Sequence, residues 1–119
     1  MFASPAHDLQ ALLAGVRDNA PDAPLIGCST AGEIATDGPG DAGVVVVALG
    51  GEGFSVATEV ARNASSDVRL AGEHAAAAVE RVAPGKHQVL LLLSDGLGGD
   101  QQEVVRGAYS VLGATIPLV

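Results

Sequence analysis

The sequence has little cysteine, few aromatic residues and little positive charge. Cys28 is its single cysteine, tryptophan is absent, and aromatic residues make up 3% of the chain. An internal disulfide and a multi-cysteine zinc site are therefore excluded, and recognition by stacking on bases is disfavoured. Lysine and arginine number 6 against 14 aspartates and glutamates, which gives a net charge of −8. We therefore expect no binding to nucleic acid.

Long apolar runs are missing as well. The longest, residues 44–49 and 89–93, are far shorter than a membrane span, and no basic segment followed by an apolar stretch stands at the beginning. We therefore expect a cytoplasmic protein that binds no membrane. The histidines His7, His74 and His87 are dispersed and lack the spacing of metal ligands. Neither a metal nor a cofactor is expected.

Small and branched apolar residues are plentiful. Hydrophobic residues make up 48% of the 119 positions, which is enough for the core of one domain. Helical spacing of these residues predicts helices over 4–19, 65–83 and 100–112. Short apolar runs predict strands at 2–3, 25–29, 44–49, 54–60, 89–93 and 116–119.

Local signals indicate where several of these elements begin and end. Ser4 followed by proline is typical of a helix N-cap, and Asp100 with Glu103 has the spacing of a capping box. Residues 35–43 are turn-rich and predict a loop. The continuously apolar run 44–49 predicts a strand covered on both faces, joined through a hairpin at 50–53 to the strand 54–60.

This order of elements predicts an α/β fold. We expect a mixed sheet with strand-helix-strand crossovers and an inserted antiparallel hairpin, with the helices packed on the sheet. We interpret residues 1–119 as a single, incomplete domain, because the chain begins at the tail of a strand and ends within another. Its exposed strand edges should make it associate with a second copy, swap strands or be marginally stable.

Three turns are candidate ligand sites, because ligands of α/β proteins gather where parallel strands end. They are residues 4–8, 28–33 and 95–100. Two of them carry the predicted ligand-binding residues: the first, 28–33, offers hydroxyls, a glycine and a carboxylate, and the second, 95–100, offers a carboxylate beside a flexible backbone. The predicted ligand-binding residues are Ser29, Thr30, Gly32, Glu33, Asp95 and Gly96.

Each candidate also has an ordinary structural interpretation. Ser29 and Thr30 are also interpretable as residues that only hydrogen-bond the backbone of their turn, and Asp100 is expected to cap a helix. The glycine-rich turn 95–100 matches neither nucleotide-binding fingerprint. Cys28 is expected to be a small buried residue, and the alternative is a nucleophile served by His7.

Several of these segments resemble one family. Residues 25–34, with the sequence LIGCSTAGEI, closely resemble the hallmark of the FIST N-terminal domain. Residues 2–8 resemble the strand end that precedes it, and residues 93–97 resemble a later strand-turn-helix. The resemblance implies a sensory module that binds a small ligand, with amino acids suggested, upstream of kinases, chemoreceptors or cyclic-dinucleotide enzymes. It transfers no catalytic residue to this chain.

Three functions follow from these observations. The first is a ligand-binding sensory module. The second is an enzyme that uses Cys28, or Ser29 with His7. The third is an interaction fragment whose exposed hairpin strand pairs with another chain.

Overall fold

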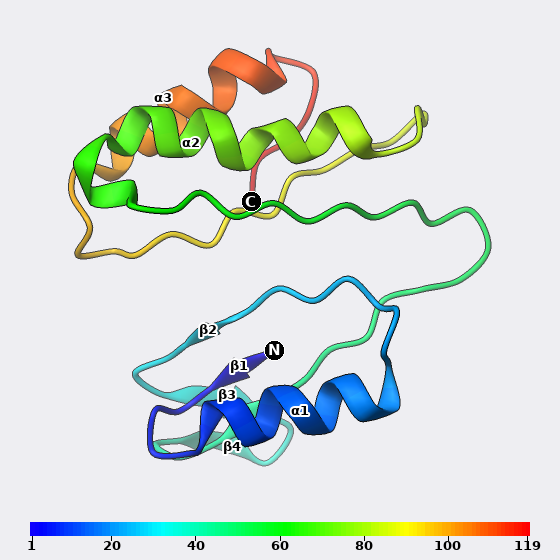
Figure 1. Ribbon diagram of the computed structural model, residues 1–119, viewed down its shortest axis with the longest axis vertical. Helices are drawn as coiled ribbons and strands as arrows, with labels where there is room; N and C mark the ends of the chain where they lie inside the picture. Colours follow the sequence, from blue (N-terminus) through cyan, green and yellow to red (C-terminus); the bar gives the residue numbers. More distant parts are fainter. The chain divides into compact units, whose positions relative to one another are not determined.

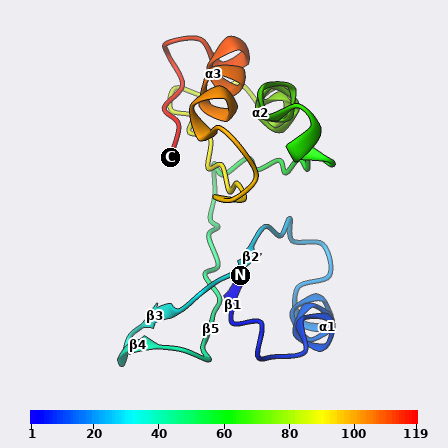
Figure 2. The same ribbon diagram turned by 90° about the vertical axis from the view of Figure 1, so that its left-hand side faces the viewer.

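Short strands lie in the first part of the chain, and the second part contains helices and one isolated parallel bridge, Leu90 with Leu118. The computed structural model describes all residues, 1–119, and divides them into two units, Met1–Phe54 and Ser55–Val119 (Figures 1 and 2). A three-stranded mixed sheet, an antiparallel hairpin and three α-helices confirm the predicted α/β class. No helix combines the length and the apolar character that crossing a membrane requires.

The first unit is organised around strand β1 (Phe2–Ala3). Strand β2 (Cys28–Ser29) pairs with β1 in parallel, and strand β5 (Val44–Val45) pairs with its other side in antiparallel. Helix α1 (Leu9–Asn19) connects β1 to β2 (Figure 1). The first predicted strand-helix-strand crossover is therefore confirmed.

Helix α1 begins later than predicted. The residue that caps it is Asp8, whose Oδ1 accepts hydrogen bonds of 3.0 Å from the backbone N–H groups of Gln10 and Ala11. Ser4 is not the N-cap. It is 3% exposed, and its hydroxyl donates to the backbone of the distant turn 41–43. A carboxylate four positions on satisfies the free N–H groups of the first helical turn instead.

The antiparallel hairpin lies elsewhere than predicted. It is formed by β3 (Glu33–Ala35) and β4 (Gly38–Gly40), within the segment predicted as a loop. Gly38 has a φ of 110°, a conformation that glycine adopts without strain and that closes this tight turn. Residues 50–60 contain no strand, so the predicted hairpin of 44–49 with 54–60 is wrong.

The run 44–49 is also not covered on both faces. Strand β5 stops at Val45, and the side chains of Val47 and Leu49 are 63% and 78% exposed. Strand β5 is an edge strand, and α1 is the single helix of its unit. One helix can cover only one face of a sheet. The apolar run 44–49 therefore predicts a strand covered on both faces, but its unit has a helix for one face only.

The second unit is built on two helices, α2 (Val68–Ala76) and α3 (Gln101–Leu112). The 3-10 turn η1 (Ala64–Ser66) precedes α2, and the 3-10 segment η2 (Ala77–Arg81) continues it. Asp67 and Asp100 cap the two helices through their side chains, which confirms the predicted cap at Asp100. The cores of the helices meet at Ala76, Ala108 and Leu112.

The predicted strands 89–93 and 116–119 pair over only a few residues, through one isolated bridge. Leu90 N–H donates to the Pro117 carbonyl at 3.0 Å, and Val119 N–H donates to the Leu90 carbonyl at 2.9 Å, in parallel. Leu90 packs on the helix core, whereas Val89 is 65% exposed. The segment is therefore buried on one face, and the prediction of a fully buried strand is wrong.

Glycines let α2 and α3 touch backbone to backbone. A Cβ atom added to Gly72 would lie 2.1 Å from the Val104 carbonyl oxygen, and one added to Gly107 would lie 2.0 Å from the Arg69 carbonyl oxygen. Both distances are far below van der Waals contact. Each helix thus contributes one glycine, and the backbone of the other helix packs directly against it.

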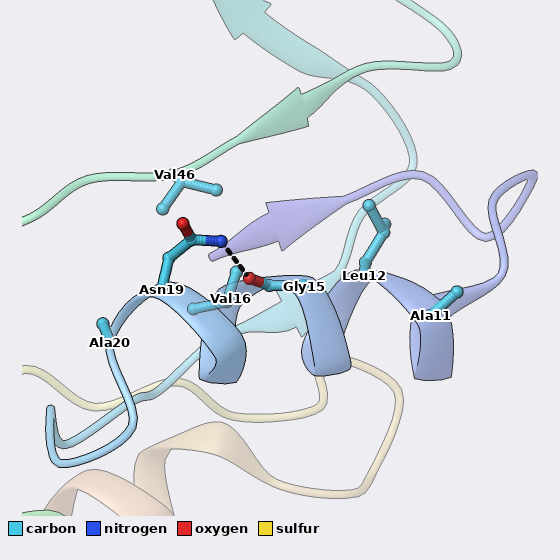
Figure 3. A pocket seen from close by; sticks show the side chains of 7 residues that line it. All are labelled: Ala11, Leu12, Gly15, Val16, Asn19, Ala20 and Val46. Atoms are coloured by element: carbon cyan, nitrogen blue, oxygen red, sulfur yellow. Dashed lines mark hydrogen bonds between the residues drawn. The ribbon is translucent and has the colours of Figure 1, made fainter.

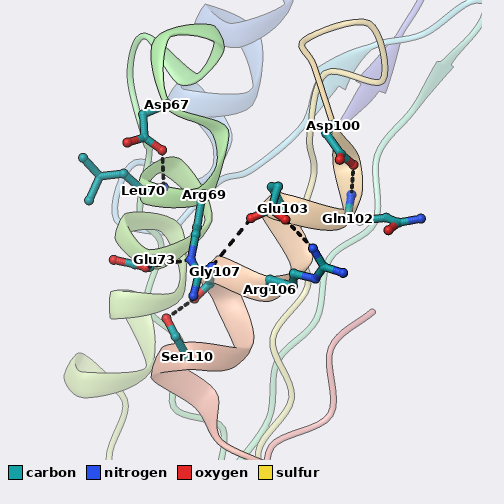
Figure 4. Close-up of polar contacts among 10 residues, drawn as sticks. All are labelled: Asp67, Arg69, Leu70, Glu73, Asp100, Gln102, Glu103, Arg106, Gly107 and Ser110. Carbon is teal, nitrogen blue, oxygen red and sulfur yellow. Dashed lines mark hydrogen bonds and ion pairs between the residues drawn. The ribbon is translucent and has the colours of Figure 1, made fainter.

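Charged side chains bridge the same two helices (Figure 4). The Arg69 guanidinium lies 3.7 Å from Glu73 on its own helix and 3.7 Å from Glu103 on α3, and Arg106 also pairs with Glu103. Glu103 therefore forms ion pairs in place of the predicted capping box. The Arg69 side chain is 55% exposed, and exposed ion pairs contribute little. The glycine contact is the stronger constraint on the crossing.

We expect Gly72→Ala and Gly107→Ala each to destabilise the protein by about 1–3 kcal/mol, because the added methyl group must push the helices apart. Gly15→Ala on α1 is the matched control, since a Cβ there meets no atom within 4 Å. It should stabilise the chain by about 0.5–1 kcal/mol. Urea unfolding followed by circular dichroism measures all three, and equal midpoints for Gly72→Ala and Gly15→Ala would contradict the backbone contact.

The extended segment before α2 is attached to the end of η2 by one ion pair. Glu59 accepts a hydrogen bond from the Val60 N–H at 2.9 Å and pairs with Arg81 at 2.5 Å, and Arg81 also donates to the Thr58 carbonyl at 2.6 Å. The Val60 N–H and, next, the Arg81 guanidinium lower the pKa of the Glu59 carboxyl. The folded chain therefore favours the carboxylate form.

A lowered pKa fixes the sign of the pH dependence. The contribution of Glu59 to stability is present above the pKa of the unfolded chain and is lost as the pH falls through the lower pKa of the folded chain. Arg81→Gln should raise the pKa of Glu59 toward its ordinary value, leaving it still lowered by the Val60 N–H. A ¹³C titration of the side-chain carboxyl measures this, with Arg62→Gln as control. An unchanged pKa in Arg81→Gln would contradict the assigned cause.

Candidate functional site

The carboxyl ends of β1 and β2 lie at one edge of the first sheet, because the two strands are parallel. Ser4 follows β1 directly and Thr30 follows β2. Thr30 N–H donates to the Ala3 carbonyl at 3.1 Å, which extends the pairing by one residue. Polar residues from two distant parts of the sequence are thus brought to the edge where α/β proteins bind ligands.

The turn 41–43, which leads into β5, joins this edge. Ser4 Oγ donates to the Asp41 carbonyl at 3.1 Å, and Ser4 N–H donates to the Gly43 carbonyl at 3.0 Å. Ser4 is 3% exposed, so both bonds are shielded from water. Ser4 therefore holds the backbone of the turn 41–43 on both sides of the turn's central residue.

Glu33, the first residue of β3, is buried at this edge. It is 5% exposed, its Oε2 accepts a hydrogen bond of 2.7 Å from the Gly43 N–H, and its Oε1 accepts one from the Thr30 hydroxyl. None of the ion pairs in the structure includes Glu33. A carboxylate can accept about four hydrogen bonds, and burying its charge without a cation is costly. Glu33 therefore retains acceptor capacity and has no cationic side chain beside it.

His7 lies on the other side of the same turn. Its Nε2 is 2.9 Å from the Ala42 carbonyl oxygen, and because a carbonyl only accepts, this ring nitrogen carries the hydrogen. The imidazole is exposed to solvent. The predicted alternative in which His7 acts as a base for Cys28 has no support in the hydrogen bonds of His7, because its partner is a backbone carbonyl.

The remaining predicted residues of the first turn are accessible. Ser29 is exposed on β2, opposite Ala3. Gly32 is exposed too, and a Cβ there would meet the Gly40 carbonyl oxygen at an ordinary 3.4 Å. Its φ is not positive, so the left-handed turn that glycine would permit is not formed. The structure thus brings Thr30 and Glu33 into direct contact and leaves Ser29 and Gly32 facing solvent.

The second predicted turn belongs to the second unit. Asp95 Oδ1 accepts from the Leu97 N–H at 2.9 Å, and Gln101 Nε2 donates to the Asp95 carbonyl at 2.9 Å. Asp95 and Gly96 are both exposed. Asp95 therefore shapes its own turn, and a ligand shared with the first turn stays a prediction.

The prediction that Cys28 is buried is wrong. The residue is exposed. It lies on β2, which has two residues and is an edge strand of the sheet. An edge strand is shielded by neighbours on one side only, so a small apolar side chain there is not enclosed.

Two shallow grooves are also present, one in each unit. The first, of about 420 Å³, runs along α1 and is lined by small apolar residues, by Val46 and by Asn19, whose amide donates to the Gly15 carbonyl at 2.8 Å (Figure 3). The second, of about 300 Å³, lies in the second unit and includes Ser94, Gly96 and Gln101. Only the second contains a predicted ligand-binding residue.

Sequence reasoning placed the turn 4–8 at this edge but missed the hydrogen bonds that Ser4 and His7 form with the turn 41–43. Ser4 was interpretable as a helix cap and the turn as part of a loop. Their hydrogen bonds join positions 37 and 35 residues apart. No local pattern of spacing reveals such contacts.

Comparison with known proteins identifies the family. The family model of the FIST N domain matches residues 1–119. No similar curated protein and no similar solved structure was found. The match covers the segments 2–8, 25–34 and 93–97 on which the sequence resemblance rests. The chain therefore belongs to the FIST N domain family, whose members generally serve as sensory domains in signal transduction.

Proposed function

We propose that this sensory domain binds a free amino acid at the edge formed by β1 and β2, and that Glu33 takes the ligand's ammonium group. One observation carries the proposal: Glu33 is buried to 5% exposure, accepts two hydrogen bonds and has no cation beside it. An ammonium group supplies three N–H donors and the missing positive charge.

The ligand's carboxylate needs donors other than basic side chains. Arg17, the single Lys or Arg of the first unit, donates to the Pro21 and Ala23 carbonyls beyond the C-terminal end of α1. The hydroxyl of Ser29 and the backbone N–H groups around Gly32 therefore remain for this role. Thr30 stays at the site as the donor to Glu33, because its hydroxyl has only one hydrogen to give. Asp95 and Gly96 are retained as a second binding turn in their own unit.

The proposal is for a binding domain without catalysis. Its output would pass to signalling partners of the kinds that the family resemblance implies: kinases, chemoreceptors or cyclic-dinucleotide enzymes. Self-association through the open edges of β2 and β5 is part of the same proposal. Sedimentation at several protein concentrations tests self-association, and a monomer at every concentration would contradict it.

A thermal-shift screen with the common amino acids tests the ligand class. A ligand at a hundredfold excess over its Kd stabilises the fold by about 2.7 kcal/mol. Glu33→Gln should weaken binding by about ten- to a hundredfold, because one charge-assisted contact is lost. Isothermal titration calorimetry measures this loss, with Glu52→Gln, an exposed glutamate of the same unit, as the matched control.

Glutamine at position 33 can still accept from the Gly43 N–H, so the fold should persist, as circular dichroism will show. Asp95→Asn forms a separate arm and reports whether the second turn contributes. If Glu33→Gln and Asp95→Asn both bind as tightly as the parent chain, the ammonium binds elsewhere and the assignment of these carboxylates fails.

Cys28 distinguishes the binding domain from a thiol enzyme. Because the thiol is exposed, Cys28→Ser should change the stability by no more than about 0.5 kcal/mol and leave amino-acid affinity within a few-fold. The native thiol should react with a disulfide reagent about as fast as that of the urea-unfolded chain. A much faster reaction of the folded chain at neutral pH would favour the nucleophile instead.

A further inference from the structure

The peptide group between Ala42 and Gly43 is held at both of its polar ends by side chains. His7 Nε2–H donates to its carbonyl oxygen at 2.9 Å, and its N–H donates to Glu33 Oε2 at 2.7 Å. The C=O and N–H of a peptide lie in one rigid plane. A side chain that fixes the direction of the carbonyl therefore also fixes the direction of the N–H.

The neighbouring peptide groups have separate supports. Ser4 holds the carbonyls of Asp41 and Gly43, on either side of this peptide, at 3.1 and 3.0 Å. These bonds fix the path of the turn but leave the central peptide plane free to rotate about its own axis. The bonds of His7 and Glu33 oppose that rotation. The exposed imidazole is thus coupled to the buried carboxylate through one planar group.

We propose that His7 is the positioning residue for Glu33. By holding the Ala42 carbonyl, its Nε2–H keeps the Gly43 N–H aimed at Glu33 Oε2, and hydrogen bonds aligned through one peptide strengthen each other. The carboxylate is thereby kept in one place at the strand edge. This inference rests on the proposed function only where it concerns a ligand, since the coupling itself exists without one.

The first experiment uses the ligand-free chain. In His7→Ala, amide hydrogen exchange at Gly43 should rise by about tenfold, the factor for loss of one ordinary hydrogen bond. The ¹³C resonance of the Glu33 carboxyl should move. His7→Gln, whose amide can still donate to the Ala42 carbonyl, should restore both signals. His87→Ala, an exposed histidine of the second unit, is the control and should change neither.

Exchange at Leu12 in α1 serves as the internal reference, because its N–H donates within the helix to the Asp8 carbonyl at 3.0 Å. An unchanged Gly43 amide in His7→Ala overturns the proposal. An equal rise at Leu12 also overturns it, since His7 would then support the fold as a whole. Failure of His7→Gln to rescue the Glu33 resonance has the same meaning.

The second experiment separates this inference from the proposed function. Calorimetry with the amino acid that gives the largest thermal shift should show about three- to tenfold weaker binding in His7→Ala, and near-parent binding in His7→Gln. Equal affinities in all three chains would overturn the positioning role and leave Glu33 as the ligand contact. If the parent chain binds no amino acid, the proposed function fails, while the exchange data still decide the role of His7.

Discussion

Simultaneous pairing of β1 with two neighbours is the constraint on which the first unit depends. Phe2 and Ala3 pair with β2 on one side and with β5 on the other, and Ala3 is 1% exposed. Because β2 is parallel to β1 and β5 antiparallel, the strand ends that meet at one edge come from three separate parts of the chain. Ser4, Thr30 and Gly43 are neighbours for this reason, although few residues are in regular strand.

The parts of the fold that local chemistry determines were predictable from the sequence. The cap at Asp100 and the crossover through α1 follow from residue type and from alternating apolar periods, although the cap of α1 is Asp8 and not the predicted Ser4. Strand lengths were not predictable in this way, because a strand exists only where a partner supplies hydrogen bonds. The valine run therefore shortens to Val44–Val45, while Gly38–Gly40, with no apolar pattern, forms a strand opposite Glu33–Ala35.

The candidate site shows the same division. The position of the edge and the choice of Glu33 follow from strand order and residue type. The burial of Glu33, the exposure of Cys28 and the contribution of His7 do not, because they depend on which distant backbone groups come close. A buried carboxylate that accepts from a hydroxyl and an amide fits two roles. The hydrogen bonds that stabilise the turn also hold the carboxylate in position to bind a cation.

The glycine crossing of α2 and α3 has a mechanical consequence. Where Gly72 and Gly107 meet the opposite backbone, no flexible side chain lies between the helices to absorb a displacement. Closely packed interiors transmit strain instead of damping it. A force applied at Asp100, where α3 begins, would therefore turn α2 with it, and the pair would behave as one stiff lever rather than as two helices that slide past each other.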